Sequence, residues 1–503
     1  MRRMVARSGD ETQPPRRTLI LVATIIGSSI TFVDGTVVNI ALPTIGRDLD
    51  AGLSSQQWVT LSYSLAVASL YIVSGALGDR YGRWTLFVVG VAGFAGASAV
   101  AGIAPNVELL IAGRVLQGVA GALLTTNSLA LLRATYGDDA GKAVGQWTAW
   151  SGIGTMIGPP LGGLLIQVAS WRWIFFLNLP FAALALVMAF AGRSEEDRTA
   201  KPRPLQLPGA VGIAVTFGGV TYGLIDGGQS GFGSSWPWFL VALAGFAVLV
   251  ISERRADEPL LPPELLRKRV FVVANVYTFL VYAALGSSTF YLALYLQSEA
   301  VGYTPARASL IFLPISVVMF FLAARFGRLA DRDGPRRYLA VAPIVMAVGF
   351  VLLTFVQSMN PFVPLPGVLV LAFGLAMLVA PITATALKAA PDRFAGLAAG
   401  VNTTVSRIGG LIAIPILGVV ITLVFAADAQ HSNLDPFATH GLSQDDRDAT
   451  VTAFRAGMAV AVALCVAGSL LALRGLPSQV TADEGGPGQA HDDADVAGDP
   501  GRQ

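Results

Sequence analysis

The sequence predicts an all-α polytopic membrane protein with two related six-helix bundles and two helices inserted between them. The chain has 503 residues, of which 54% are hydrophobic and 13% charged, whereas a soluble chain carries roughly 25% charged residues. Long apolar stretches alternate with short charged loops. The loop segment 75–83 also recurs 252 residues later, at 327–336, and such a repeat indicates an internal duplication.

The apolar stretches are long enough to cross a bilayer, which needs about 20 residues per helix. Fourteen such stretches are expected, at 18–42, 57–77, 85–104, 107–133, 142–166, 173–192, 208–226, 236–252, 271–297, 306–326, 338–357, 364–387, 398–425 and 453–474. The first is too long for a signal-peptide core.

Lysine and arginine fix the expected orientation, because they concentrate in cytoplasmic loops. With the N-terminus in the cytoplasm, the inner segments hold 26 of these residues and the outer loops hold 4. We therefore expect a multi-pass protein of the cytoplasmic membrane with both termini in the cytoplasm.

The repeat offset also predicts the domains, because it maps the first six helices onto the last six. We expect an N-terminal arm (1–17), a first bundle (18–192), an insertion with the seventh and eighth helices (193–269), a second bundle (270–474) and a disordered acidic tail (475–503). Duplicated halves in a membrane protein are typical of transporters that rock around a central site.

Composition excludes several other functions. A net charge of +2 does not indicate nucleic-acid binding, and the single cysteine, Cys465, excludes an internal disulfide or a thiolate zinc site. The apolar stretches contain no histidine and no paired acids. We therefore expect no metal, no cofactor and no enzymatic activity, and a monomer that contacts lipid, protons and a small-molecule substrate.

Two opposite charges inside the first half are candidates for proton coupling. Asp34 and Arg114 each lie roughly 10 Å beneath the outer face, counting 1.5 Å per residue from the helix ends, and Gln117 shares a helix face with Arg114. A carboxylate at that depth is costly unless it pairs, protonates or faces a cavity. A fixed salt bridge between helices is the alternative.

Glycines mark the fifth predicted helix. Gly154, Gly158 and Gly162 recur every four residues, with Pro159 and Gly163 beside them. Small residues at this spacing let helix backbones touch, and proline kinks a helix. Plain close packing and a seam that bends during a transport cycle both fit.

The repeated loop is a candidate gate. In the first copy Gly75 and Gly82 permit a tight turn, Asp79 suits a helix N-terminus, and Arg80 and Arg83 offer cationic contacts. The second copy keeps Asp331 and Arg332. Ordinary positively charged inner loops would explain the arginines but not the glycines and aspartates.

A third buried charge and several aromatic residues are candidates for a substrate cavity. Arg407, in the middle of the thirteenth helix, either contacts substrate or locks packing. Flat apolar solutes stack on aromatic rings, although such rings more often serve packing. The aromatic candidates are Trp58, Tyr63, Trp147, Trp150, Phe290 and Tyr291.

At these residues the chain resembles the major facilitator superfamily, and within it the 14-helix drug:proton antiporters. The resemblance rests on residues 34–43, the loop 75–83, residues 114–118, residues 154–163 and residues 171–180. Trp84 departs from the pattern, because a basic residue is usual there.

The resemblance implies proton-coupled efflux of hydrophobic or cationic small molecules and drugs by alternating access. A dedicated proton-coupled exporter of one physiological product, such as an antibiotic, a siderophore or a lipid, is the alternative.

Overall fold

The protein is helical in every regular element that the structure describes. The computed structural model describes residues 14–193, 207–256, 259, 262–391, 394–431 and 434–477, so most of the expected arm and tail lie outside the described residues. The helices are α1 (Pro14–Asp48), α2 (Leu53–Tyr81), α3 (Arg83–Gly102), α4 (Val107–Tyr136), α5 (Ala140–Val168), α6 (Trp173–Phe176), α7 (Asn178–Ala191), α8 (Leu207–Ser230), α9 (Phe232–Arg255), α10 (Pro263–Arg267), α11 (Arg269–Gln297), α12 (Pro305–Asp333), α13 (Pro335–Leu353), α14 (Pro364–Lys388), α15 (Ala395–Asp428) and α16 (Gln444–Gly475), with a short 3₁₀ turn at Gly137–Asp139.

The number of helices agrees approximately with the fourteen expected spans. Within the described residues, twelve helices are long and apolar enough to cross a membrane, and α2 makes thirteen when its two bent parts are taken as one span. Helix α5 occupies the position of the remaining expected span. The sixth expected span is divided at Leu177 into α6 and α7.

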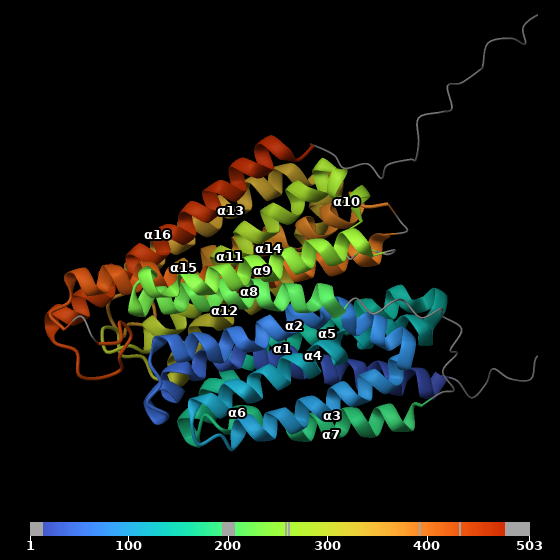
Figure 1. Cartoon of the computed structure of the whole chain (residues 1–503), viewed down its shortest axis with the longest axis horizontal. Helices are drawn as coiled ribbons and strands as arrows, with labels where there is room; N and C mark the ends of the chain where they lie inside the picture. The colour runs from blue at the N-terminus through green and yellow to red at the C-terminus, as the bar shows by residue number, and fades with distance from the viewer. Residues whose placement is uncertain are drawn as a thin grey trace, which may run out of the picture.

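The helices form two bundles with the same internal arrangement. In the first bundle α1 packs on α5, α2 on α4, and α3 on α4 and α7; in the second, α11 packs on α15, α12 on α14, and α13 on α14 and α16. Figure 1 shows the first bundle in blue to blue-green and the second in yellow-green to red. The predicted fold class is therefore confirmed.

The repeat is also visible in backbone geometry. Gly82 and Gly334, which are 252 residues apart, both have positive φ, at 99° and 88°. Each residue separates two consecutive long helices, and a side chain at such a φ would be strained. Three helices, α4, α12 and α16, begin at capping side chains, those of Asn106, Thr304 and Ser443. At the start of α4 the Asn106 side chain accepts a hydrogen bond from the backbone N–H of Leu109 (3.0 Å).

We call the side where α1 begins and α16 ends the termini face, and the other side the opposite face. Three of the hydrogen bonds that join the two bundles lie near the opposite face. Gln57 donates to the Tyr291 hydroxyl (2.7 Å), Gln297 donates to the backbone carbonyl of Ile40 (3.1 Å), and the backbone N–H of Leu53 donates to Asp435.

Asp435 lies in the loop between α15 and α16, so this loop reaches across to the start of α2 in the other bundle. Burial raises the pKa of the Asp435 carboxyl, and hydrogen bonds from the backbone N–H groups of Phe437 and Leu53 oppose that increase. The Phe437 ring lies 5.8 Å from the Tyr291 ring. The loop therefore covers the seam between the bundles at the opposite face.

Helix α5 closes the same seam against α12. A Cβ atom added at Gly163 would lie 2.3 Å from the Ser309 hydroxyl oxygen and 2.8 Å from the backbone carbonyl oxygen of Pro305. Only glycine lets the two bundles approach this closely.

The inserted helices α8 and α9 pack on each other and lie beside the bundles. Helix α8 also packs on α2 and α15, whereas α9 contributes few buried residues. Figure 1 shows this pair in green, in front of the line where the two bundles meet. The inserted pair therefore covers the α2–α15 seam from one side.

Replacing Gly163 with valine is expected to wedge the two bundles apart at the opposite face, because overpacking a tight contact costs about 1–3 kcal/mol. Spin labels at Ile103 and Phe362, which are 66% and 74% exposed on the opposite face of the two bundles, measure the separation. Gly145→Val is the matched control on the same helix, since a Cβ there meets nothing within 4 Å. An unchanged distance distribution in Gly163→Val would contradict this account of the seam.

Candidate functional site

A closed polar cluster lies inside the first bundle. The Arg114 guanidinium forms an ion pair with the Asp34 carboxylate, and each of these side chains is 1% exposed. Gln117 accepts a hydrogen bond from Arg114 (2.8 Å) and donates to Asp34 (3.2 Å). The three residues that the sequence placed at one depth are therefore in direct contact.

Two uncharged residues that the sequence analysis missed complete the cluster. The Asn178 amide donates to Asp34 (3.2 Å) and to the Ser98 hydroxyl (3.2 Å), and Gln117 also donates to Ser98 (2.8 Å). Both residues are buried. The segment 171–180 was noted for its resemblance to the family, but nothing in its pattern indicated that Asn178 faces Asp34.

Helix α2 closes the cluster from another side. The Arg114 Nε donates to the backbone carbonyl of Val59 (3.0 Å), and the Tyr63 ring lies 4.4 Å from the guanidinium carbon. A Cβ at Gly118 would lie 2.5 Å from the carbonyl oxygen of Tyr63, so α4 and α2 are in backbone contact here. Five helices of one bundle thus hold a single ion pair away from water.

The glycines of α5 pack directly on the part of α1 that carries Asp34. A Cβ at Gly154, Gly158 or Gly162 would lie 2.5–3.2 Å from Ser29, Thr36 or Val37. Pro159 lies within this stretch of α5. Because Gly163 contacts α12, α5 touches both the Asp34 helix and the second bundle.

The repeated segments lie at the termini face, with different partners in the two copies. The expectation of a loop over 75–83 is wrong, because α2 continues to Tyr81 and α3 begins at Arg83, so that Gly82 alone makes the turn. Asp79 in the last turn of α2 binds Arg83 (3.0 Å), and the Arg80 guanidinium lies 5.6 Å from the Tyr81 ring.

The first copy packs on α4. A Cβ at Gly75 would lie 3.5 Å from Thr126, and Arg83 also donates to the Ala130 carbonyl (3.4 Å). In the second copy Asp331 pairs with Lys388 (2.7 Å) and Arg332 lies near Asp333 (3.7 Å).

The aromatic candidates are scattered rather than gathered at one place. Phe290 and Tyr291 are fully buried within the second bundle and lie 4.9 Å apart. Trp147 donates to the Ser28 hydroxyl (3.0 Å), and Trp150 is 58% exposed. Trp58 packs on Tyr222 of α8 (5.9 Å).

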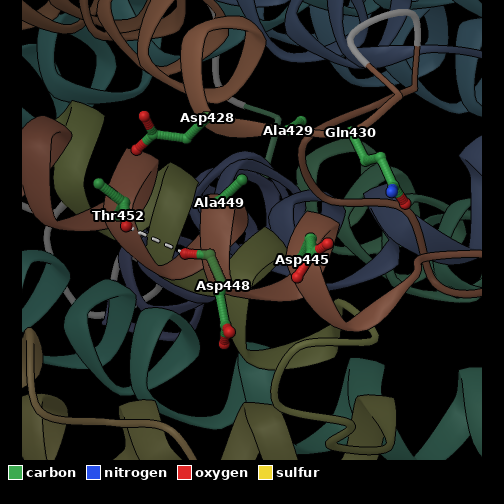
Figure 2. Close-up of a pocket in the computed structure, with 7 residues that line it drawn as sticks. All are labelled: Asp428, Ala429, Gln430, Asp445, Asp448, Ala449 and Thr452. Carbon is green, nitrogen blue, oxygen red and sulfur yellow. Dashed lines mark hydrogen bonds between the residues drawn. The ribbon is translucent and has the colours of Figure 1, made fainter.

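A surface pocket on the opposite face lies between the end of α15 and the start of α16. Figure 2 shows its carboxylates, Asp428, Asp445 and Asp448, pointing in different directions. Over the described ranges, no group of three or more His, Cys, Asp and Glu residues could hold a metal ion.

Three curated bacterial proteins are similar to this chain over most of its length. The multidrug resistance protein Stp of Mycobacterium tuberculosis (strain CDC 1551 / Oshkosh) is 32% identical over 85% of this chain and 80% of its own. The puromycin resistance protein pur8 of Streptomyces alboniger is 33% identical over 91% of both. The tetracenomycin C resistance and export protein of Streptomyces glaucescens is 32% identical over 80% of this chain and 76% of its own.

A solved structure and a family model agree with these relatives. An auto-inhibited POT family peptide transporter superposes with a TM-score of 0.65 at 14% identity, covering 93% of this chain and all of the other. The model of the Major Facilitator Superfamily matches residues 24–414, which is more than half of the chain. This chain therefore belongs to the Major Facilitator Superfamily.

Proposed function

We propose that the protein exports small drug-like molecules across the cytoplasmic membrane in exchange for protons, by alternating access. Its relatives are multidrug and antibiotic resistance proteins, and proton coupling follows from the family. The observation that carries the proposal is the buried Asp34–Arg114 cluster in one of two duplicated bundles. Asp34 is an ionisable side chain within a membrane-spanning helix, where such residues are rare and commonly mark proton or substrate pathways.

The proposed orientation places the termini face in the cytoplasm, as the bias of lysine and arginine indicates. Under this orientation the hydrogen bonds from Gln57, Gln297 and Leu53 close the outer side. Each buried hydrogen bond contributes about 0.5–1.5 kcal/mol. A few such contacts set the equilibrium between inward-facing and outward-facing conformers, and a bound proton or substrate can shift that equilibrium.

The cluster supplies a physical coupling step. A proton on Asp34 removes its charge, and the neutral group no longer attracts the Arg114 guanidinium. Loss of the charge on one partner of a buried ion pair costs about 3–5 kcal/mol, because the other charge stays buried without compensation. The guanidinium must therefore move to new partners. Because Gly158 and Gly162 pack on α1 and Gly163 packs on α12, movement of α1 is transmitted through α5 to the seam.

Asp34→Asn is expected to keep the fold and to abolish export driven by a pH gradient, because the amide retains hydrogen-bonding groups but cannot carry a proton. Dye efflux from proteoliposomes with and without the gradient measures this. Glu108→Gln, which removes an exposed acid at the start of α4, is the matched control. Gradient-driven efflux at the wild-type rate in Asp34→Asn would refute the coupling role.

Arg114→Ala is expected to shift the pH optimum of transport and not only its rate, because the Asp34 carboxylate loses its cationic partner. The profile of initial efflux rate against pH is the measurement, with Arg133→Ala on the exposed part of α4 as the control. A variant that changes the rate but leaves the shape of the profile unchanged would show that Arg114 only maintains packing.

Asp79→Ala is expected to favour inward-facing conformers several-fold, because a helix-terminus charge contact is worth about 0.3–2 kcal/mol. The proposed partner is the start of α15, at residues 394–399. Spin-label distances between Gly141 and Arg337 report on the cytoplasmic side. Asp331→Ala serves as the comparison and is expected to do less, since Pro335 in the second copy departs from the pattern of the first. Equal distributions in wild type and Asp79→Ala would leave the loop without a gating role.

A further inference from the structure

Arg407 differs from Arg114 in having no ion-pair partner among the residues that the structure describes. It lies on α15, in the second bundle, and its Nε atom is buried without a hydrogen-bond partner. Arg407 forms no ion pair or hydrogen bond with the side chains that the structure describes. A cation within a membrane-spanning helix is costly unless an anion or a polar cavity accommodates it.

Arg407 lies on the helix of the second bundle that packs on α2 of the first bundle. Its charge acts electrostatically on Tyr63 and Tyr71 of α2. The Tyr63 ring also lies on the Arg114 guanidinium. Tyr63 therefore contacts the paired Arg114 and also feels the charge of Arg407 from the other bundle.

Open space adjoins Arg407 on its own helix face. Gly410 and Gly400 lie three residues after it and seven residues before it, spacings that place all three on one face. A Cβ added at either glycine would meet nothing within 4 Å, whereas one at Gly409 would lie 2.8 Å from the carbonyl oxygen of Phe279. The space beside Gly400 and Gly410 is thus unfilled, while Gly409 packs on α11.

We propose that Arg407 is the anion-binding group of the substrate site, so that the exported molecules include amphipathic organic acids with an aromatic body. The inference rests on the proposed export function. The guanidinium provides a planar set of donors that matches a carboxylate or phenolate, and the tyrosines provide ring faces and hydroxyl donors. The Asp34 charge is unavailable to Arg407, since Arg114 already neutralises it.

The test compares two xanthene dyes of opposite charge, fluorescein as the anion and rhodamine 123 as the cation. Wild-type, Arg407→Gln and Arg407→Lys proteins are reconstituted into liposomes. A pH gradient is imposed, and the liposomes are removed by filtration at each time point. The dye in the filtered medium is then measured after the medium is adjusted to one pH. Arg455→Gln is the matched control, because this arginine is exposed on α16 and donates to the Thr354 carbonyl away from the seam.

We expect the wild type to export fluorescein and Arg407→Gln to lower that rate by roughly tenfold or more, the scale of one charge-assisted hydrogen bond. The fluorescein efflux rate of Arg407→Lys should lie between those of the wild type and Arg407→Gln, because lysine keeps the charge but lacks the planar set of donors. Rhodamine 123 efflux should be unchanged. An equal fall for both dyes, or no fluorescein export by a wild type that exports rhodamine 123, would overturn the proposal.

A binding measurement separates this inference from the proposed function. Anisotropy titration of fluorescein with the detergent-purified protein reports on the subsite without transport. If neither dye moves under a gradient, the export function fails; fluorescein binding that is tight in the wild type and weakened in Arg407→Gln would still support the anion subsite. Fluorescein binding equal in wild type and Arg407→Gln would refute it.

Discussion

A carboxylate and a guanidinium, Asp34 and Arg114, are buried together between helices where water does not solvate them. That pair survives only because neighbouring groups satisfy the remaining donors and acceptors: Gln117 and Asn178 on the acid, and the Val59 carbonyl on the arginine. Four other helices must hold their rotation and depth around α1 for these contacts to form. The pair therefore makes the first bundle a rigid unit while the acid is charged.

The contacts between the two bundles differ from the contacts within each bundle. Within a bundle, glycines bring backbones into contact, as Gly90 does against Leu124 and Gly349 against Leu371. Between the bundles, the structure has side-chain hydrogen bonds near the opposite face and close approaches at glycines, of Gly163 to Ser309 and of Gly418 to Gln57. Strong internal packing with a thinner seam is what allows two bodies to rotate against each other, because packed cores do not deform gradually.

The sequence predicted the fold because hydropathy and loop charge are summed over whole helices and loops, so the prediction does not depend on the position of any single side chain. It predicted the contact of Asp34 with Arg114 because both depths follow from the rise per residue. Rotation about a helix axis was not predictable: Gly162 faces α1 whereas Gly163, about 100° further round, faces α12. Ser98 and Asn178 were missed for the same reason. Uncharged polar residues are frequent in these helices, and no local pattern states which of them face the acid.

The separation of the proposed proton site at Asp34 from the proposed anion site at Arg407 has an electrical consequence. A cycle that brings one proton inward and carries one monovalent acid outward moves two elementary charges in the same electrical direction. Each is worth about 2.3 kcal/mol per 100 mV of membrane potential. Exchange of one proton for one monovalent cation moves no net charge and gains nothing from the voltage. An unpaired arginine on one bundle, opposite a neutralised pair on the other, would thus let the cell's resting potential work on acidic substrates in addition to the pH gradient.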